Sequence, residues 1–165
     1  MIRQPISIRS ILCAFGLSLT FTGSIQAERP VTTEFINATS GKVIDQRGDR
    51  LPAFYGKAGA PPSALVPAGI AWKARWQTML KVPAKDEYQF ELRGSGSAGL
   101  SVSSQDLLTT MNKVSEPIAL APGVHNISIT FTPAEKGIAQ LRWFWKSSAF
   151  GWEPVPSRAL VRSLV

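Results

Sequence analysis

The amino-acid sequence predicts an all-β protein, an antiparallel β-sandwich or barrel, preceded by a cleaved signal peptide. Three observations predict this class. Several runs of residues alternate between apolar and polar side chains, turns rich in Gly and Pro separate these runs, and no stretch of useful length has a helical period. Short alternating strands joined by regular turns are typical of antiparallel sandwiches and barrels.

Residues 1–27 have the pattern of a secretory signal peptide. Arg3 and Arg9 make the start basic, residues 11–21 are uncharged and mostly apolar, and small residues precede Glu28. The apolar run is shorter than the roughly 20 residues that cross a bilayer, although a retained membrane anchor is the alternative. We expect cleavage after Ala27, export to the periplasm or the medium, and no membrane contact after cleavage.

The remaining chain, residues 28–165, is predicted to form a single domain. Its length is enough to bury one core without disulfides, and the only cysteine, Cys13, lies in the signal segment. The lack of cysteine excludes a thiolate metal site and a covalently attached c-type haem. Loss of Arg3 and Arg9 lowers the formal charge from +7 to +5. Because the bases are scattered, we expect a solvated surface and no nucleic-acid partner.

The N-terminal third of this domain is its least regular part. Residues 32–36 and 42–45 are candidate strands. Residues 50–69 contain many prolines and glycines, so we expect a long surface loop there.

The clearest strand covers residues 72–82. Trp72, Trp76 and Leu80 fall on one face and Lys73 and Arg75 on the other, which predicts a half-buried strand. Pro83 cannot donate to a ladder and ends it. Residues 84–87 then form a predicted turn, and residues 88–93 alternate again, which completes a hairpin.

Turn residues separate the remaining predicted strands. The sequence GSGSAG, residues 94–99, is expected to be a flexible turn before residues 100–103. Residues 117–120, 125–131 and 138–146 follow, with Ala139, Leu141, Trp143 and Trp145 facing inward in the last of them.

No set of side chains with catalytic spacing is visible. His125 is the only histidine and lies in phase with apolar neighbours, so a structural role is favoured. Asp86 and Glu87 are adjacent in a predicted turn, whereas a glycosidase needs two carboxylates facing one cleft. No serine lies in a nucleophile-elbow context. We therefore expect no enzymatic activity, no metal and no cofactor.

Two segments are candidates for ligand binding. Ser95 and Ser97 lie in the Gly-rich segment, and Phe150 and Trp152 lie in the irregular stretch 147–156. An aromatic side chain on a loop can stack on a sugar or a partner protein. The alternative is that Phe150 or Trp152 closes the end of the core. Trp72, Trp76, Trp143 and Trp145 are in phase with apolar neighbours and are expected to be core residues.

The order of these motifs resembles the protective-antigen-type module, a β-barrel domain inserted in secreted glycosidases, adhesins and toxins. The matching positions are Arg75, Trp76, Leu80, Val82, Pro83, Tyr88, Phe90, Leu92, Leu120, Gly123, His125, Ile127, Ile129, Phe131, Gly137, Ala139, Leu141, Trp143, Trp145, Pro154, Pro156 and Leu160. The resemblance extends from about residue 69 to 160, and more loosely from about residue 34. The phrases "ELRGSGSAGLSV" and "RWFWKSSAFGWEPVPSRAL" are most similar to a variant that precedes c-type haem domains in exported bacterial proteins.

Two departures from the family pattern bear on function and packing. Sugar-binding members carry two adjacent aspartates before a glycine after the "Y.F.L" strand, and these hold Ca²⁺. Residues 94–99 contain no carboxylate, and calcium usually needs anionic oxygen ligands, so calcium-dependent binding is not expected. Thr78 stands where the family usually has glycine, with an expected effect on local packing only.

The resemblance and the residues together imply an exported, non-catalytic recognition module. It would bind a cell-surface carbohydrate or an exported protein partner, without calcium. The alternative is a structural or assembly domain that accompanies a c-type cytochrome or another redox partner.

Overall fold

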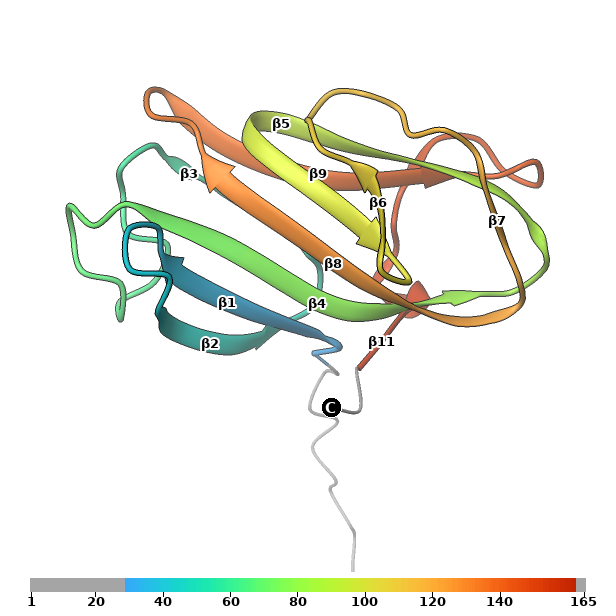
Figure 1. Cartoon of the computed structure of the whole chain (residues 1–165), viewed down its shortest axis with the longest axis horizontal. Helices are drawn as coiled ribbons and strands as arrows, with labels where there is room; N and C mark the ends of the chain where they lie inside the picture. Colours follow the sequence, from blue (N-terminus) through green and yellow to red (C-terminus); the bar gives the residue numbers. More distant parts are fainter. Residues whose placement is uncertain (1–28, 163–165) are drawn as a thin grey trace, which may run out of the picture.

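Period-two alternation decides which segments of the chain become strands. The computed structural model describes residues 29–162 (Figure 1), so the signal segment and its cleavage site lie outside the described residues. The strands are β1 (Val31–Asn37), β2 (Val43–Asp49), β3 (Phe54–Lys57), β4 (Trp72–Val82), β5 (Asp86–Val102), β6 (Gln105–Leu108), β7 (Ile118–Leu120), β8 (Gly123–Pro133), β9 (Ile138–Lys146), β10 (Glu153–Pro154) and β11 (Leu160–Val161), and the short 3₁₀ helix η1 (Ser157–Ala159) precedes β11. No helix in residues 29–162 is long and apolar enough to cross a membrane.

The strands form one antiparallel, 11-stranded sheet that curls over into two layers. The order along the sheet is β10-β9-β5-β8-β4-β1-β2, with β3 on β9, β11 on β4, and β6 and β7 on β5. We call β3, β7, β9, β10 and the first half of β5 the β9 layer. The second half of β5 together with β6, β8, β4, β11, β1 and β2 is the β8 layer. The fold class predicted from the sequence is therefore confirmed.

Strand β5 belongs to both layers, and the predicted turn at residues 94–99 is wrong. The ladder with β9 runs from Gln89 to Ser95, and the ladder with β8 runs from Gly96 to Val102. The Gly-rich segment is thus a bend within one strand (Figure 1). Glycine is typical of turns and also of sharp bends where another strand approaches the backbone closely. In this segment the glycines form such a bend.

Two glycines make the bend possible. A Cβ added to Gly94 would lie 1.9 Å from the carbonyl oxygen of Gln140, and one added to Gly96 would lie 2.5 Å from that of Thr132. Their φ angles are +147° and +131°, a region that residues with side chains rarely adopt. The neighbouring strands therefore approach β5 at a distance that only glycine permits.

Aromatic side chains fill the space between the layers. Trp72, Trp76, Trp143 and Trp145 are each at most 4% exposed, so their predicted core positions are confirmed. At one end the ring centroid of Trp72 lies 5.1 Å from that of Phe54, and at the other the rings of Tyr88 and Trp145 stack at 5.7 Å. Edge-on and offset contacts at such distances add to the hydrophobic gain of burying large rings.

Most other predicted strands are present, with two differences. Residues 32–36 and 42–45 fall in or at the start of β1 and β2, and residues 138–146 coincide with β9. The expected loop at 50–69 contains β3, whose Phe54 pairs with Leu141 of β9. Asp86 and Glu87 open strand β5 and do not form a turn.

Thr78 has a larger role than local packing, which corrects the sequence expectation. Its side chain is buried, and its hydroxyl lies 3.1 Å from the carbonyl oxygens of both Pro30 and Val161, to either of which it can donate. The beginning and the end of the described chain therefore lie side by side against β4 (Figure 1).

We expect Gly94→Ala to lower the free energy of unfolding by about 2–4 kcal/mol, because the added methyl group meets backbone and the φ angle is strained. Urea denaturation followed by tryptophan fluorescence measures the change. Gly151→Ala is the matched control, since nothing lies within 4 Å of its added Cβ; its effect should stay within about 0.5 kcal/mol. Equal effects of the two substitutions would contradict the bend.

Candidate functional site

The four side chains that the sequence predicted for ligand binding do not form one site. Ser95 donates a hydrogen bond to the carbonyl oxygen of Ile138 at the bend of β5. Ser97 lies on the outer face of the β8 layer, opposite Thr132. Phe150 packs at the end of the core, and Trp152 lies over the outer face of the β9 layer.

Phe150 closes one end of the aromatic core. Its ring centroid lies 5.0 Å from that of Trp145 and 6.4 Å from that of Tyr88, whose hydroxyl donates to the carbonyl oxygen of Ala84. Burial raises the pKa of Tyr88 above its ordinary value. Phe150 thus packs against the end of the core, which is the position expected in one of the two interpretations that the sequence left open.

Trp152 lies between two cations on the outer face of the β9 layer. Its ring centroid is 5.7 Å from the guanidinium carbon of Arg93 and 5.2 Å from Nζ of Lys146. Both cations project outward, because Leu92 and Trp145, their neighbours in β5 and β9, are buried. The side chain of Trp152 is only half-buried, so part of its ring remains available for contact.

Short strand β10 holds Trp152 in this place. Glu153 and Pro154 pair with Trp145 and Phe144 of β9, and Nε1 of Trp145 donates to Oε1 of Glu153 at 3.1 Å. The chain leaves β9 at Lys146, turns through residues 147–151 and returns along the same strand. This return brings Trp152 back over the outward side chains of β9.

Phe144 is a second aromatic residue on this face, and sequence reasoning missed it. The guanidinium carbon of Arg93 lies 4.1 Å from its ring centroid, and that of Arg142 lies at 6.0 Å. The alternation of the strand could have identified it. Because Trp143 and Trp145 face inward, the aromatic residue between them must face water. An outward aromatic within an alternating strand is therefore a candidate contact residue.

Tyr55 of β3 extends the same face and was also missed. It pairs with Gln140 of β9 and is 73% exposed. Directly opposed residues in an antiparallel ladder share a face, and Gln140 faces outward because Ala139 and Leu141 are buried. We define the aromatic–cation face by its outward side chains: Tyr55, Glu91, Arg93, Arg142, Phe144, Lys146 and Trp152.

The central cation of this face has a fixed position. Nε of Arg93 donates to Oε2 of Glu91 at 2.8 Å, and Nη2 lies 2.7 Å from the same oxygen. Stacking of a guanidinium over an aromatic ring contributes about 0.5–1 kcal/mol at an exposed site. Arg93 is therefore held between Glu91, Phe144 and Trp152, with guanidinium N–H groups left to donate to a ligand.

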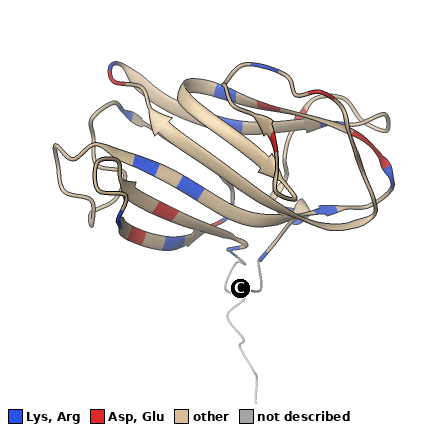
Figure 2. Cartoon of the chain, viewed as in Figure 1, with Lys and Arg blue, Asp and Glu red and all other residues tan. Residues whose placement is uncertain are grey.

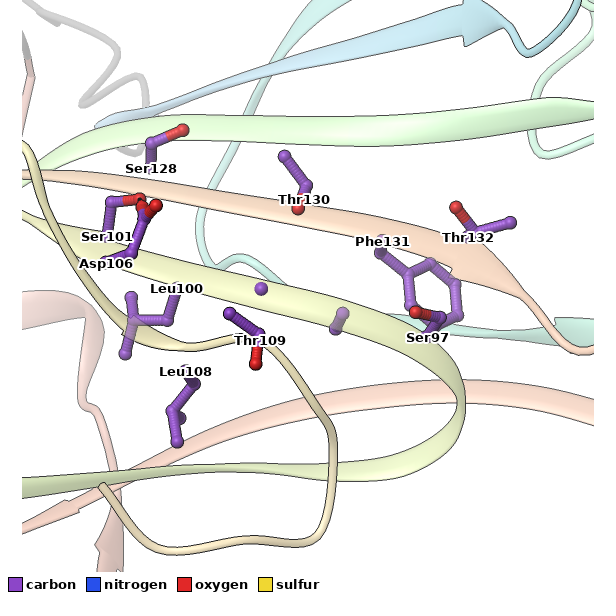
Figure 3. Close-up of a pocket in the computed structure, with 12 residues that line it drawn as sticks. Ser97, Leu100, Ser101, Asp106, Leu108, Thr109, Ser128, Thr130, Phe131 and Thr132 are labelled. Atoms are coloured by element: carbon purple, nitrogen blue, oxygen red, sulfur yellow. Dashed lines mark hydrogen bonds between the residues drawn. The ribbon is translucent and has the colours of Figure 1, made fainter. Parts of the chain in front are cut away.

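Ser97 lines a hydroxyl-rich hollow on the outer face of the β8 layer (Figure 3). The hollow has a volume of about 350 Å³. Its polar wall consists of Ser97, Ser101, Asp106, Thr109, Ser128, Thr130 and Thr132. Asp106 is the one carboxylate in this wall, and it already accepts a hydrogen bond from the hydroxyl of Ser101.

Within residues 29–162, no three His, Cys, Asp or Glu side chains lie close enough together to hold a metal ion. Neutral hydroxyls with a single carboxylate are a poor ligand set for calcium. The hollow beside Ser97 thus offers hydrogen bonds to a polar ligand and little to a cation.

Asp86 is a structural carboxylate. Ser148 donates to it from its backbone N–H at 3.1 Å and from its hydroxyl at 2.8 Å, which ties the turn after β9 to the start of β5. These hydrogen bonds, that of the Ser148 hydroxyl above all, lower the pKa of Asp86 below its ordinary value. Because the carboxylate is satisfied within the fold, a catalytic role is not favoured.

His125 also has local partners. Nε2 lies 2.8 Å from the carbonyl oxygen of Ala121, and Nδ1 lies 3.4 Å from the hydroxyl of Ser103. These contacts agree with the structural role expected from the sequence. Taken together, the described residues form an aromatic and basic face on β9 and a hydroxyl-lined hollow on β8.

No protein-family model matches the sequence, and no curated protein matches it. Several solved structures are similar to this chain. The PA14 sugar-binding domain from an RTX adhesin is 13% identical, with a TM-score of 0.66 over 83% of this chain and 100% of that chain. The A domain of epithelial adhesin 6 from Candida glabrata, solved in complex with Galβ1-3GlcNAc, is 10% identical, with a TM-score of 0.60 over 82% and 88%.

An anti-sigma factor domain-containing protein from Clostridium clariflavum is similar as well, at 16% identity and a TM-score of 0.68. The match covers 82% of this chain and 47% of that one, so the chain spans about half of the length of this relative. These likenesses show that the chain has the fold of the PA14, or protective-antigen-type, module. The fold implied by the sequence motifs is confirmed.

We expect Ser148→Ala to raise the pKa of Asp86 toward its ordinary value, because the carboxylate loses its strongest hydrogen bond. A carboxyl group whose pKa is lowered on folding stabilises the fold at pH values above its ordinary pKa. This contribution is lost as the pH falls through the lowered pKa, below about pH 4. NMR titration of the Asp86 carboxyl carbon measures the shift. Ser103→Ala, which removes a hydroxyl from a site that does not contact Asp86, should leave the titration unchanged; an unchanged titration in Ser148→Ala would contradict the assignment.

Proposed function

We propose that the protein is a non-catalytic recognition module that binds carbohydrate through the aromatic–cation face, without calcium. The observation that carries the proposal is the position of Trp152, which is half-buried between Arg93 and Lys146, while Arg93 also lies over the ring of Phe144. Sugar-binding adhesin domains among the similar folds support the general class. The ligand and the binding face are the proposal.

The chemistry of this face suits a sugar. A pyranose ring presents C–H groups on one side and hydroxyls around its edge. Flat aromatic side chains can cover the C–H side at low cost in conformational entropy. The N–H groups of Arg93, Arg142 and Lys146 can donate to ring hydroxyls, and the carboxylate of Glu91 can accept from them.

The charge of the face favours acidic sugars. Arg93, Arg142 and Lys146 carry positive charge, and Glu91 is already paired with Arg93. A carboxylate or sulfate on the sugar would therefore gain charge-assisted hydrogen bonds. We expect a uronic-acid-containing or sulfated polysaccharide to bind more tightly than its neutral counterpart.

Binding without calcium follows from the same sequence departure. In sugar-binding members of the family, the cation is held by acidic residues after the "Y.F.L" strand. The corresponding segment here is the bend of β5, where the residues pair with β9 and β8 and carry no carboxylate. A chelator should therefore leave carbohydrate binding unchanged.

The assembly-domain alternative makes a different prediction for the same face. Aromatic residues and arginine are also enriched at protein–protein interfaces, so the face would equally suit an exported protein partner. In that case substitutions on the face would remove a co-purifying cytochrome or other redox protein, and glycan binding would be absent.

We expect Trp152→Ala to weaken binding to acidic polysaccharides by about tenfold or more, because truncating a central aromatic contact typically has effects of this size. Trp152→Phe keeps a ring and should retain most of the affinity. Leu65→Ala removes an exposed apolar side chain elsewhere, at a position 66% exposed, and should have no effect. Isothermal titration calorimetry with and without EDTA measures all four proteins.

Two outcomes would contradict the proposal. Unchanged affinity in Trp152→Ala would place the ligand elsewhere, with the hydroxyl-rich hollow beside Ser97 as the next candidate. Loss of binding in EDTA would show that a cation takes part.

A further inference from the structure

A second surface lies beside the two ends of the described chain. It is a hollow of about 500 Å³ lined by Arg29, Pro30, Met79, Lys81, Arg158, Leu160, Val161 and Arg162. Strand β11 pairs with β4, Leu160 opposite Leu80 and Val161 opposite Met79, which brings the C-terminal cations next to Lys81. We call this surface the terminal groove. It lies on β4 and β11, apart from the aromatic–cation face on β9.

The terminal groove is basic at its rim. Lys81, Arg158 and Arg162 are exposed and form no ion pair with another described residue. Arg29 uses one guanidinium N–H on the carbonyl oxygen of Gly48, at 3.4 Å. No Asp or Glu is among the lining residues, and Lys and Arg gather near the two ends of the described chain in Figure 2.

One carboxylate at the end of β2 is already engaged by other side chains. Asp49 pairs with Val31 at the end of β2, near Arg29. Its Oδ2 accepts from the hydroxyl of Thr33 at 2.7 Å and from Nε of Arg47 at 3.2 Å. The positive charge at the groove therefore stays available to an external anion.

The floor of the groove is apolar. Met79 and Val161 lie side by side on the paired strands, and Val161 is 37% exposed. A ring of cations around exposed apolar side chains complements a surface that is anionic outside and apolar beneath. The headgroup region of an anionic membrane has this composition.

The groove brings together residues from the two ends of the described chain. Arg29 lies at the beginning of the described chain, and Arg158 and Arg162 lie near its end. Thr78 holds both ends of the described chain at this site. The groove therefore gathers cations from both ends of the described chain on one surface.

We propose that the terminal groove docks the domain onto an anionic phospholipid surface, with Lys81, Arg158 and Arg162 contacting phosphate groups and Val161 facing the apolar boundary. This contact is peripheral and independent of carbohydrate binding. It differs from the sequence-based expectation of no membrane contact after cleavage, because the cations of β4 and of the C-terminal segment are far apart in the sequence.

The test compares three forms of the full chain: the unchanged protein, Lys81→Ala/Arg158→Ala/Arg162→Ala, and the control Lys57→Ala/Lys73→Ala/Lys136→Ala. The control removes the same charge from exposed lysines elsewhere on the fold. The apolar N-terminal segment is common to all three proteins, so differences between them report on the cations alone. Circular dichroism verifies that each variant is folded.

Partition onto vesicles is measured by sedimentation, with phosphatidylglycerol–phosphatidylcholine mixtures and with phosphatidylcholine alone. We expect the groove variant to partition onto anionic vesicles on the order of 100-fold more weakly, at roughly fivefold per cation near the surface. The control should differ little from the unchanged protein. The difference should vanish on phosphatidylcholine, and also in about 1 M salt, where charge interactions are screened within roughly 3 Å.

Two results would overturn the proposal. The first is an equal loss in the groove variant and the control, which would mean that net charge and not the groove governs binding. The second is unchanged partition of the groove variant together with weaker binding to alginate, a soluble acidic polysaccharide, which would assign the groove to that polymer.

Discussion

One extended segment, β5, passes through both layers, and the arrangement of the molecule depends on the close backbone contact at its bend. Gly94 lies so near the carbonyl oxygen of Gln140, and Gly96 so near that of Thr132, that no side chain fits. The first half of β5 is thereby fixed on β9 and the second half on β8. Closing the layers in this way leaves an interior for large aromatic side chains and sets which residues face water on either side.

The alternation of each strand then gives the outer faces different chemistry. On β9, the buried tryptophans leave Arg142, Phe144 and Lys146 outward, and β5 adds Arg93 beside them. On β8 the outward positions are mainly Ser and Thr, which yields a surface of hydroxyl groups. The same fold thus carries an aromatic and basic surface on β9 and a hydroxyl-rich surface on β8.

The sequence was sufficient for those features that depend on neighbours along the chain. The strands at 72–82 and 138–146 and their buried tryptophans follow from alternation alone. The Gly-rich segment was misread because glycine marks both turns and close approach, and only the partner strand distinguishes the two. The outward orientation of Phe144 could have been predicted from the alternation of its strand. The role of Thr78 and the grouping of Lys81 with Arg158 depend on contacts between distant segments.

Cross-strand NOEs across the bend test the continuity of β5 most directly. If β5 is one strand shared by both layers, we expect backbone NOEs between Arg93 and Arg142 and between Leu100 and Ile129 within one folded species, because these residues are opposed in the two ladders. A hairpin turn at residues 94–99 would instead bring Arg93 opposite Leu100. Backbone NOEs between those two residues, with the ladder contacts to β9 and β8 missing, would contradict the shared strand and the faces built on it.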